Sequence, residues 1–390
     1  MPTMLRRLAA VTASTAIGLL GPTVPVAHAD APPVVEPAGL EPAGLNPAGL
    51  DPAVVNLATN PGFEIPTLPL ADYGSIPGWN CGAGEATVTA DAHSGSAALS
   101  VTPAGAASPG QCGQTVSVRP DTTYTLSAWV NGSYVFLGAT GTGHDVPPAW
   151  TASTDGGWQQ LTTSFTTGAD TSSVQLYLHG WYNQGGYRAD DVELDGPAVD
   201  PARATWNVPT TDRVVFFTID DGWYRTPEAA RFIADHQLPI TAFPLPMPSG
   251  FQPDYFQQVT AVPGSSVQDH TVSHRDLTTL SPAEQQAEIC SARDIDQRIY
   301  GSTPTVFRPP YFAYNAATLQ AAANCGLRTV LTATADFSFG ASTVYRGGLL
   351  QPGDVVIMHF TDTLAADLQR ALDAANAAGL RPAGLITYLH

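Results

Sequence analysis

Hydrophobic and polar residues alternate with a period of two through much of the chain between residues 56 and 197. In residues 124–130, for example, Leu126, Ala128 and Val130 share one face of an extended chain and Trp129 points to the other. Gly, Asn, Asp and Pro separate such runs, as they do at turns between antiparallel strands. The pattern predicts an all-β sandwich over residues 56–197. The expected strands include residues 97–101, 115–118, 124–130, 134–137, 159–165, 174–179 and 191–194.

The period changes beyond Arg213, where short apolar runs alternate with segments of helical periodicity. The apolar runs are residues 214–219, 240–243, 305–307, 329–331 and 355–358. One helix is expected to begin at Ser281, because Pro282 suits a first helical turn and Glu284 stands where a capping box needs it. Another is expected to begin near residue 226. This alternation predicts parallel strands with helices outside them, in an α/β domain over residues 211–390.

The N-terminal segment differs from both of these regions. Arg6 and Arg7 precede a short apolar run, and the small-x-small sequence Ala27-His28-Ala29 follows it. Residues 1–29 are therefore predicted to be an export signal. An uncleaved anchor is the alternative, but the run is short for a membrane-spanning helix. Residues 30–55 carry Pro-Ala-Gly-Leu repeats that predict an extended spacer, and residues 198–210 are predicted to be a linker. We expect a secreted protein without a membrane span.

Composition narrows the choice of partners and of redox compartment. The 390 residues include 16 Lys+Arg and 34 Asp+Glu, a formal charge of -18, which argues against a nucleic-acid partner. Four cysteines follow the predicted signal, and an even number in an exported protein favours disulfides. Two fall in each half, so the economical pairing is Cys81 with Cys112 and Cys290 with Cys325. A zinc–thiolate site is the alternative, but the chain has no Cys-x-x-Cys pair.

Side chains capable of chemistry follow the predicted strands of the second domain. The set comprises Asp220, Asp221, His270, His274, Arg308 and His359. Because the carboxyl ends of parallel strands meet at one edge, we expect these side chains to lie together. A catalytic cation of the zinc type needs three protein ligands and an open position for water. One carboxylate and the two imidazoles of His270 and His274 can supply those ligands, so the set predicts metal-assisted hydrolysis.

Asp220 and Asp221 are expected to have different roles. Neighbouring side chains on an extended backbone point apart, so one acid can bind the cation while the other stays free as a base. Gly222 permits a sharp turn after them. The plainer alternatives are an ordinary Asp-Asp-Gly turn, two surface histidines, a surface ion pair at Arg308 and a buried histidine at position 359. The strand before the acids and the histidines downstream argue against the first two alternatives, and the other two stay open.

These motifs, in this order, make residues 211–390 resemble the polysaccharide deacetylase family, also called the NodB-homology or carbohydrate esterase family 4 domain. The resemblance implies a distorted, incomplete (β/α) barrel and a divalent cation, zinc first, with cobalt, nickel or manganese as alternatives. The implied metal ligands are Asp221, His270 and His274. Asp220 would be the general base, Arg308 would orient it, and His359 would be the general acid. The backbone near Tyr311 would help to hold the oxyanion.

One segment departs from the family pattern, which usually has an Asp and a nearby Trp supporting the general acid. The chain reads Asp336-Phe337-Ser338-Phe339 there. The resemblance assigns the supporting role to Asp336, with Phe337 or Phe339 in place of the Trp. The segment leaves the tuning of His359 open.

The β-rich half resembles jelly-roll carbohydrate-binding modules, through residues 56–64 at its start and residues 189–192 at its end. Such modules often hold a structural calcium near those two ends, and the resemblance points to Glu64 and Asp191, whose alternative role is to cap turns. Aromatic residues on the outer faces of the predicted strands could bind sugar, or could fill a second core face. The candidates are Trp129, Tyr177, Trp181 and Tyr187, whereas Trp79 is expected in the core.

The sequence therefore predicts a secreted, monomeric, metal-dependent deacetylase whose β-module tethers it to polysaccharide. The expected substrate is N-acetylated or O-acetylated, of the chitin or cell-wall type. The first alternative is a catalytically decayed glycan-binding protein, motivated by the altered segment around Asp336. The second is a non-haem iron oxygenase, since two histidines and a carboxylate also suit iron. The free acid beside the predicted ligands fits hydrolysis better.

Overall fold

A computed structural model describes residues 54–65, 76–82, 84–250 and 252–389 of the chain. The predicted export signal and almost all of the repeat spacer lie outside these residues. Within them, no helix combines the length and the apolar character needed to cross a membrane.

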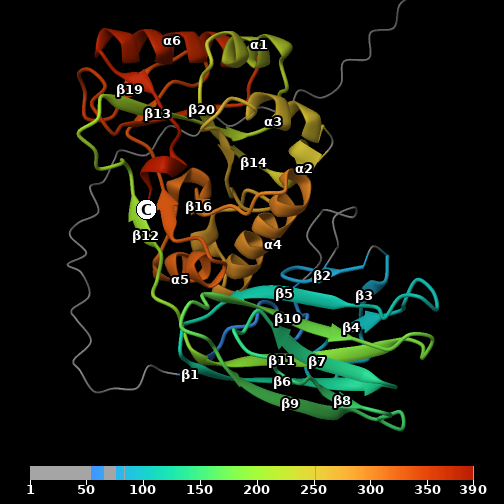
Figure 1. Ribbon diagram of the computed structural model, residues 1–390. Helices are drawn as coiled ribbons and strands as arrows, with labels where there is room; N and C mark the ends of the chain where they lie inside the picture. The colour runs from blue at the N-terminus through green and yellow to red at the C-terminus, as the bar shows by residue number, and fades with distance from the viewer. Residues whose placement is uncertain (1–53, 66–75, 83, 251, 390) are drawn as a thin grey trace, which may run out of the picture. The chain divides into compact units, whose positions relative to one another are not determined.

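The first half of the described chain forms two antiparallel sheets (Figure 1). Alternate residues of the central strands point between the sheets, and Leu126, Ala128 and Val130 are fully buried there. Trp79 is also in this core, and the predicted all-β half is confirmed. The six-stranded sheet contains β1 (Val54–Asn56), β3 (Ala86–Thr89), β4 (Ala98–Val101), β6 (Thr123–Gly132), β9 (Gln159–Thr166) and β11 (Tyr187–Pro197). The five-stranded sheet contains β2 (Asn80–Cys81), β5 (Cys112–Ser117), β7 (Val135–Thr140), β8 (Ala149–Thr151) and β10 (Ser173–His179).

The second half is built around β13 (Val214–Asp221), which is buried along almost its whole length. It pairs in parallel with β14 (Ile240–Pro244), β20 (Val355–His359) and β21 (Arg381–Pro382). The sheet continues from β14 to β15 (Ser266–Val267), and from β20 to β18 (Ala335–Asp336) and β19 (Thr343–Val344). A second sheet joins β12 (Arg203–Thr205), β17 (Thr329–Leu331) and β16 (Val306–Phe307) in parallel. Residues 198–210 are predicted to be only a linker, but part of this segment forms β12. The strand forms there because residues 203–205 pair with the free edge of β17.

Helices follow most of these strands, as the alternating pattern predicted. They are α1 (Pro227–Asp235), α2 (Pro246–Gly250), α3 (Pro253–Val259), α4 (Pro282–Tyr300), α5 (Ala316–Asn324) and α6 (Leu364–Ala377), with 3-10 turns at Leu277–Thr279, Pro310–Phe312 and Ile386–Tyr388. Helices α1 and α6 lie side by side over the sheet of β13 and β20 (Figure 1). The start of α4 is the expected capping box, in which Ser281 and Glu284 each accept from the other's backbone N–H. Gly301 ends the helix in the left-handed conformation that glycine adopts without strain.

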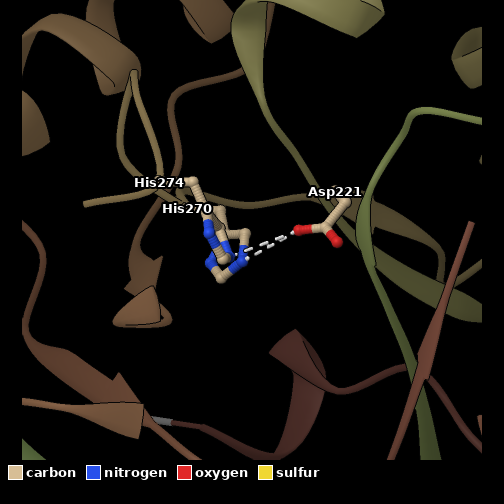
Figure 2. A group of neighbouring side chains, drawn as sticks. All are labelled: Asp221, His270 and His274. Atoms are coloured by element: carbon tan, nitrogen blue, oxygen red, sulfur yellow. Dashed lines mark ion pairs between the residues drawn. The ribbon is translucent and has the colours of Figure 1, made fainter. Parts of the chain in front are cut away.

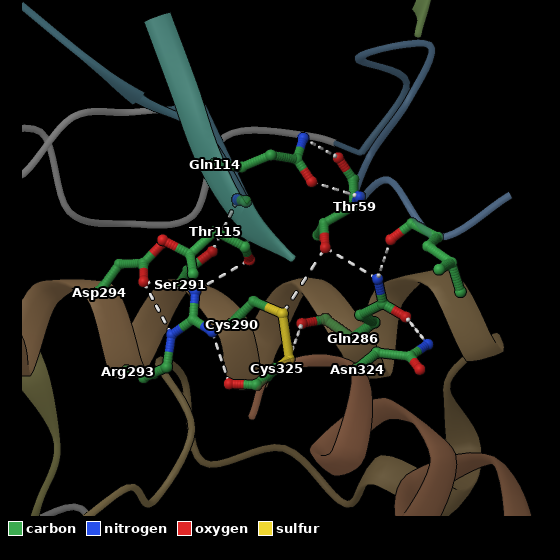
Figure 3. The surroundings of a disulfide bond; sticks show 12 residues. Thr59, Gln114, Thr115, Gln286, Cys290, Ser291, Arg293, Asp294, Asn324 and Cys325 are labelled. Carbon is green, nitrogen blue, oxygen red and sulfur yellow. Dashed lines mark hydrogen bonds and ion pairs between the residues drawn. A yellow bond between two sulfur atoms is a disulfide. The ribbon is translucent and has the colours of Figure 1, made fainter. Parts of the chain in front are cut away.

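Both predicted disulfides are present, Cys81–Cys112 and Cys290–Cys325. The second joins α4 to the residue that follows α5, and Figure 3 shows its surroundings. Thr59 of the sandwich half lies against it, with Oγ1 3.6 Å from the Cys290 sulfur and 2.8 Å from Nε2 of Gln286 on α4. Helix α4 is therefore fixed by a covalent bond on one side and by polar contacts with the sandwich residues on another.

Candidate metal centre and active site

The chemistry-bearing side chains converge at the carboxyl ends of neighbouring parallel strands, as predicted. Strand β13 ends with Asp220 and Asp221, and Asp220 is the register partner of His359 at the end of β20. The loop after β15 carries His270 and His274. A β-bridge between residues 269 and 307 brings this loop level with the end of β16, where Arg308 follows. Pairing between strands thus gathers residues that are far apart in the sequence.

Asp221, His270 and His274 face one another around a common point (Figure 2). The Asp221 Oδ1 atom lies 3.5 Å from Nε2 of His270 and 3.4 Å from Nε2 of His274. That oxygen is buried and has no hydrogen-bond partner in the described part of the chain. Among the described residues, these three form the one group of His, Cys, Asp or Glu side chains with ligand atoms close enough to hold an ion. An unpartnered carboxylate oxygen between two imidazoles fits a cation, which would replace the missing hydrogen bond.

The turn after the acids depends on glycine. Asp221 itself has a φ of 76° and Gly222 a φ of 100°. A Cβ at position 222 would lie 2.9 Å from the ring of Phe256, in addition to being strained by that φ. Gly222 therefore allows the chain to turn away while the Asp221 carboxylate stays at the centre.

Hydrogen bonds orient both imidazoles so that Nε2 faces Asp221. The Nδ1 atom of His270 lies 2.8 Å from the carbonyl oxygen of Arg308, which can only accept, so this nitrogen carries the proton. The Nδ1 atom of His274 lies 3.2 Å from the Tyr311 hydroxyl. Partners of this kind fix the ring orientation and the tautomer of a metal-binding histidine.

Glu288 of α4 holds the loop between the two histidines, and the sequence reading missed it. Its Oε2 accepts from the backbone N–H groups of Val272 (3.1 Å) and Ser273 (2.9 Å), and its Oε1 accepts from the Ser273 hydroxyl. Glu288 is only 2 % exposed. A signal was available, because Glu288 shares a helical face with the apolar residues Ala292 and Ile295. An acid at such a position needs internal donors.

Asp220 and Arg308 form a buried ion pair beside these three residues. Arg308 donates from Nη1 to Asp220 Oδ1 (2.7 Å) and to Thr218 Oγ1 (2.8 Å), and its other nitrogens donate to the carbonyls of Leu331 and Thr332. The second carboxylate oxygen, Oδ2, lies 3.8 Å from Nε2 of His270. Asp220 therefore borders the centre without belonging to the group of three, and its role as a base stays a prediction.

The pKa values around the centre agree with cation binding. Burial alone would raise the pKa of Asp221, but the three histidines around it outweigh burial and lower this pKa to about 2. Burial, with the neighbouring His270, lowers the pKa of His274 to about 4. Burial opposes charge on His270 too, yet Asp220 and Asp221 together raise its pKa. At neutral pH Asp221 is thus ionised and His274 is neutral, which are the forms that bind a metal.

His359 is supported by Ser338 and not by Asp336, so that prediction is wrong. The Ser338 Oγ atom lies 2.9 Å from Nδ1 of His359, and the Phe339 ring stacks against the imidazole. Asp336 is the register partner of Ile357, two residues before His359 on β20, and its buried Oδ1 has no hydrogen-bond partner within the described residues. Because β18 and β20 pair in register, Asp336 lies beside Ile357, and Ser338, two residues later, lies beside His359.

Tyr311 borders the centre beside His274, in the turn Pro310–Phe312. Its side chain is 55 % exposed, its hydroxyl contacts His274, and its backbone has a left-handed φ of 59°. The oxyanion role of its backbone stays a prediction.

The predicted sugar-binding aromatics separate into three environments. Tyr177 and Trp181 belong to the five-stranded sheet side, where Phe136 stacks with His179 and contacts Trp181. Trp129 lies on the six-stranded sheet and stacks on His93, so it cannot join them. The prediction for Tyr187 is wrong: it is 3 % exposed, and its hydroxyl donates into the core, toward the carbonyls of Gly110 and Leu178. Sequence reading also missed Trp150, which is 53 % exposed and stacks with Phe136.

Glu64 and Asp191 bind the turn of residues 93–97 through hydrogen bonds. Glu64 accepts from the backbone N–H and hydroxyl of Ser96, at 2.7 and 2.6 Å. Asp191 accepts from the Ser94 hydroxyl and contacts Nδ1 of His93, both at 2.7 Å. This is the turn-capping role given as the alternative, and calcium binding stays a prediction.

Each half of the chain matches a known protein family. The family model described as "Polysaccharide deacetylase" matches residues 207–330, and the one described as "Carbohydrate binding domain" matches residues 55–186. The chain is 39 % identical over 201 residues to an uncharacterised protein of Streptomyces coelicolor, covering 50 % of this chain and 77 % of the relative. It is 49 % identical over 142 residues to Exochitinase 1 of Streptomyces olivaceoviridis, covering 36 % of this chain but 22 % of the relative. It is 29 % identical over 193 residues to a chitin deacetylase of Pestalotiopsis sp, covering 46 % of this chain and 65 % of the relative. With this active-site geometry, the matches establish that the chain belongs to the polysaccharide deacetylase family and carries a carbohydrate-binding domain before its deacetylase domain.

Proposed function

We propose that the protein is a secreted, metal-dependent hydrolase that removes acetyl groups from N-acetylated or O-acetylated polysaccharide. The observation that carries the proposal is the buried, unpartnered Oδ1 of Asp221 between two imidazoles, beside a second acid held by Arg308. Relatives named chitin deacetylase and chitooligosaccharide deacetylase support a chitin-type or cell-wall substrate. The two disulfides support an oxidising, extracellular location.

Asp221, His270 and His274 would hold the cation. One carboxylate oxygen and two imidazole nitrogens suit zinc, and cobalt, nickel or manganese are the other candidates. When bound, the ion would polarise the acetyl carbonyl and acidify water at the open position.

Asp220 is the proposed general base. Arg308 occupies its Oδ1, which leaves Oδ2 on the side of the centre to take a proton as water attacks the acetyl carbon. The backbone N–H at Tyr311 is the proposed donor to the oxyanion. When the bond from the acetyl carbon to the sugar nitrogen or oxygen breaks, its electron pair goes to that leaving atom, which takes a proton from His359. Acetate and the free amine or hydroxyl are the products.

We also propose a fold type for each half of the chain. The deacetylase half is a distorted, incomplete barrel, supported by the bridge of residue 269 to 307 and by the bond from Thr334 N–H to the Val355 carbonyl. These two contacts connect the short β16–β17 sheet to β15 on one side and to β20 on the other. The sandwich is a jelly roll, and the proposed domain boundaries are those predicted from the sequence, except that residues 203–205 pair with β17 and join the deacetylase half.

The sandwich is the proposed glycan tether. Trp150 and Trp181 are exposed on the side of the five-stranded sheet, and Phe136, Tyr177 and His179 lie between and beside them. Flat aromatic surfaces bordered by polar groups suit the apolar faces of sugar rings. We expect the protein to act as a monomer, with polysaccharide as its partner.

The convergence of the acids and histidines favours an active enzyme over a decayed one. The free Asp220 beside the ligand group favours hydrolysis over oxygen chemistry by iron. Oxygen uptake by an iron-loaded sample without acetate release would support the oxygenase instead.

Acetate release tests the proposal directly. The wild-type protein is incubated with chitooligosaccharides and with acetylated xylan, first as purified, then after chelation, then after zinc is restored. We expect activity that is lost on chelation, recovered with zinc and absent in Asp221→Ala. Activity that survives both complete metal removal and Asp221→Ala would refute the mechanism.

A further inference from the structure

Ser338 is the residue that contacts the Nδ1 atom of His359, at 2.9 Å from its hydroxyl oxygen. Ser338 is 3 % exposed, so water does not compete freely for this bond. A hydroxyl can donate to this nitrogen or accept from it, and it carries no charge in either case. The bond fixes the plane of the imidazole and leaves Nε2 as the nitrogen available to a substrate.

The segment around Ser338 is held on both sides, so the hydroxyl is placed rigidly. Before it, the Phe337 N–H donates to the carbonyl of Ile357 (2.9 Å). After it, the Gly340 N–H donates to Oδ1 of the buried Asp367 at the start of α6 (3.0 Å). Asp367 also accepts from the Thr363 hydroxyl and pairs with Arg370. The Phe339 ring, 5.3 Å from the imidazole between centroids, restricts the other side of the histidine.

The nearest acid in the sequence does not share this task. Asp336 is level with Ile357, one side-chain repeat below His359, because β18 and β20 are parallel and in register. His359 is level with Asp220 on its other side. His359 thus lies between Asp220, the proposed base, and the uncharged hydroxyl of Ser338, which fixes the orientation of its ring.

We propose that Ser338 is a positioning residue for His359, and that through it Ser338 sets the preference of the enzyme between acetyl amides and acetyl esters. This inference rests on the proposed function. An amine is a poorer leaving group than a sugar hydroxyl, so cleavage of the carbon–nitrogen bond depends more on a correctly aimed proton from His359. A ring that loses its Nδ1 partner aims that proton less well. Removing the hydroxyl therefore slows amide cleavage more than ester cleavage.

The test compares acetate release from N-acetylated chitooligosaccharides and from O-acetylated xylan. For Ser338→Ala we expect kcat on the amide to fall at least about tenfold, a part of the ~10²–10⁴-fold that a proton donor contributes. We expect a clearly smaller fall on the ester, with KM and bound metal unchanged. Ser338→Thr keeps a hydroxyl and restores the amide rate. Ser342→Ala removes an exposed hydroxyl from the same region and serves as the matched control.

A second readout is independent of turnover. The nitrogen NMR shifts of the His359 ring should change at Nδ1 in Ser338→Ala and return toward wild type in Ser338→Thr. Equal losses on both substrates, or a ring unchanged in Ser338→Ala, would overturn the positioning role while leaving the deacetylase proposal intact. A wild-type protein that releases acetate from neither substrate would overturn both.

Discussion

Arg308 donates from Nη1 to Oδ1 of Asp220 across 2.7 Å, and both side chains are almost completely buried. The same guanidinium binds a threonine hydroxyl and two carbonyl oxygens. The planar fork of arginine suits this arrangement, whereas the single ammonium of lysine cannot reach all of these acceptors. The ion pair thus gives Asp220 a fixed position beside the three candidate metal ligands.

Removing Arg308 should destabilise the fold. In Arg308→Met, Asp220 is left charged in a buried site, so we expect a loss of roughly 3–5 kcal/mol in the free energy of unfolding. Adding Asp220→Asn should recover part of it, because the unpaired charge is then gone. Denaturant unfolding measures both variants. The exposed Arg231→Met is the control, with an expected change within about 0.5 kcal/mol. Equal stabilities of Arg308→Met and wild type would contradict the paired-charge account.

The two adjacent acids should be separable by metal content. Asp221→Asn removes the negative oxygen between the imidazoles, so the purified variant should hold little zinc. Asp220→Asn keeps the ligand group and should retain zinc, while acetate release falls by ~10²–10⁴-fold through loss of the base. Elemental analysis together with an acetate assay gives both values. If Asp220→Asn lost zinc and Asp221→Asn retained it, the roles of ligand and base would be reversed.

Glu288 should matter for metal affinity although it is not a ligand. Glu288→Ala removes the acceptors of three hydrogen bonds in the loop between the histidines, and we expect zinc affinity to fall by about 10–100-fold. Glu288→Gln should lose less, because its amide oxygen can still accept from the backbone. Competition with a chelating dye measures the affinity. Glu284→Ala, on the same helix, removes the capping box and should cost about 1 kcal/mol of stability without changing zinc affinity.

Glycan binding should depend on one face of the sandwich. Trp150→Ala and Trp181→Ala should each weaken binding to chitooligosaccharides by about 1 kcal/mol, a ~fivefold change, since each loses an exposed ring. Trp129→Ala alters the other sheet and is the matched control. Calorimetric titration distinguishes them. If Trp129→Ala weakened binding and the other two did not, the binding face would be the six-stranded sheet.

Stability of the metal-free protein should fall as the pH rises. Burial raises the pKa of Asp269 to about 8, and the hydrogen bond from the Thr271 N–H and the charges of His270 and Arg293 oppose this only in part. In the unfolded chain the carboxyl ionises near pH ~4. The folded state therefore holds the extra proton between about pH 4 and pH 8, and the free energy of unfolding decreases through that window.

Asp269→Asn tests this dependence. The amide oxygen can still accept from the Thr271 N–H, as Oδ1 of Asp269 does at 3.0 Å. We expect a flatter decline of Tm between pH 5 and pH 8 than in the wild type, measured with a chelator present. Parallel declines in the two proteins would show that Asp269 is not the group responsible.

Local patterns in the sequence were enough for the fold class and for most of the centre. Leu126, Ala128 and Val130 recur at every second position and share one face, and that alternation is a property of the strand alone. Ser281 and Glu284 cap α4 through neighbours three residues apart. The convergence of Asp220, Asp221, His270 and His274 could be predicted because parallel strands share one carboxyl edge, and the family resemblance then pointed to Asp221 as the ligand.

The remaining assignments depended on contacts between distant segments. Whether Asp336 or Ser338 meets His359 is set by the register of β18 against β20, since a shift of two residues exchanges them. Tyr187 lies near Trp181 in the sequence, but its ring enters the core between the sheets, on the same strand face as the buried Ala189. Glu288 accepts hydrogen bonds from the loop between His270 and His274 only because helix α4 packs against that loop. Spacing along a chain specifies which face a side chain takes on its own element, whereas the partner it meets is specified by pairing and packing with residues tens or hundreds of positions away.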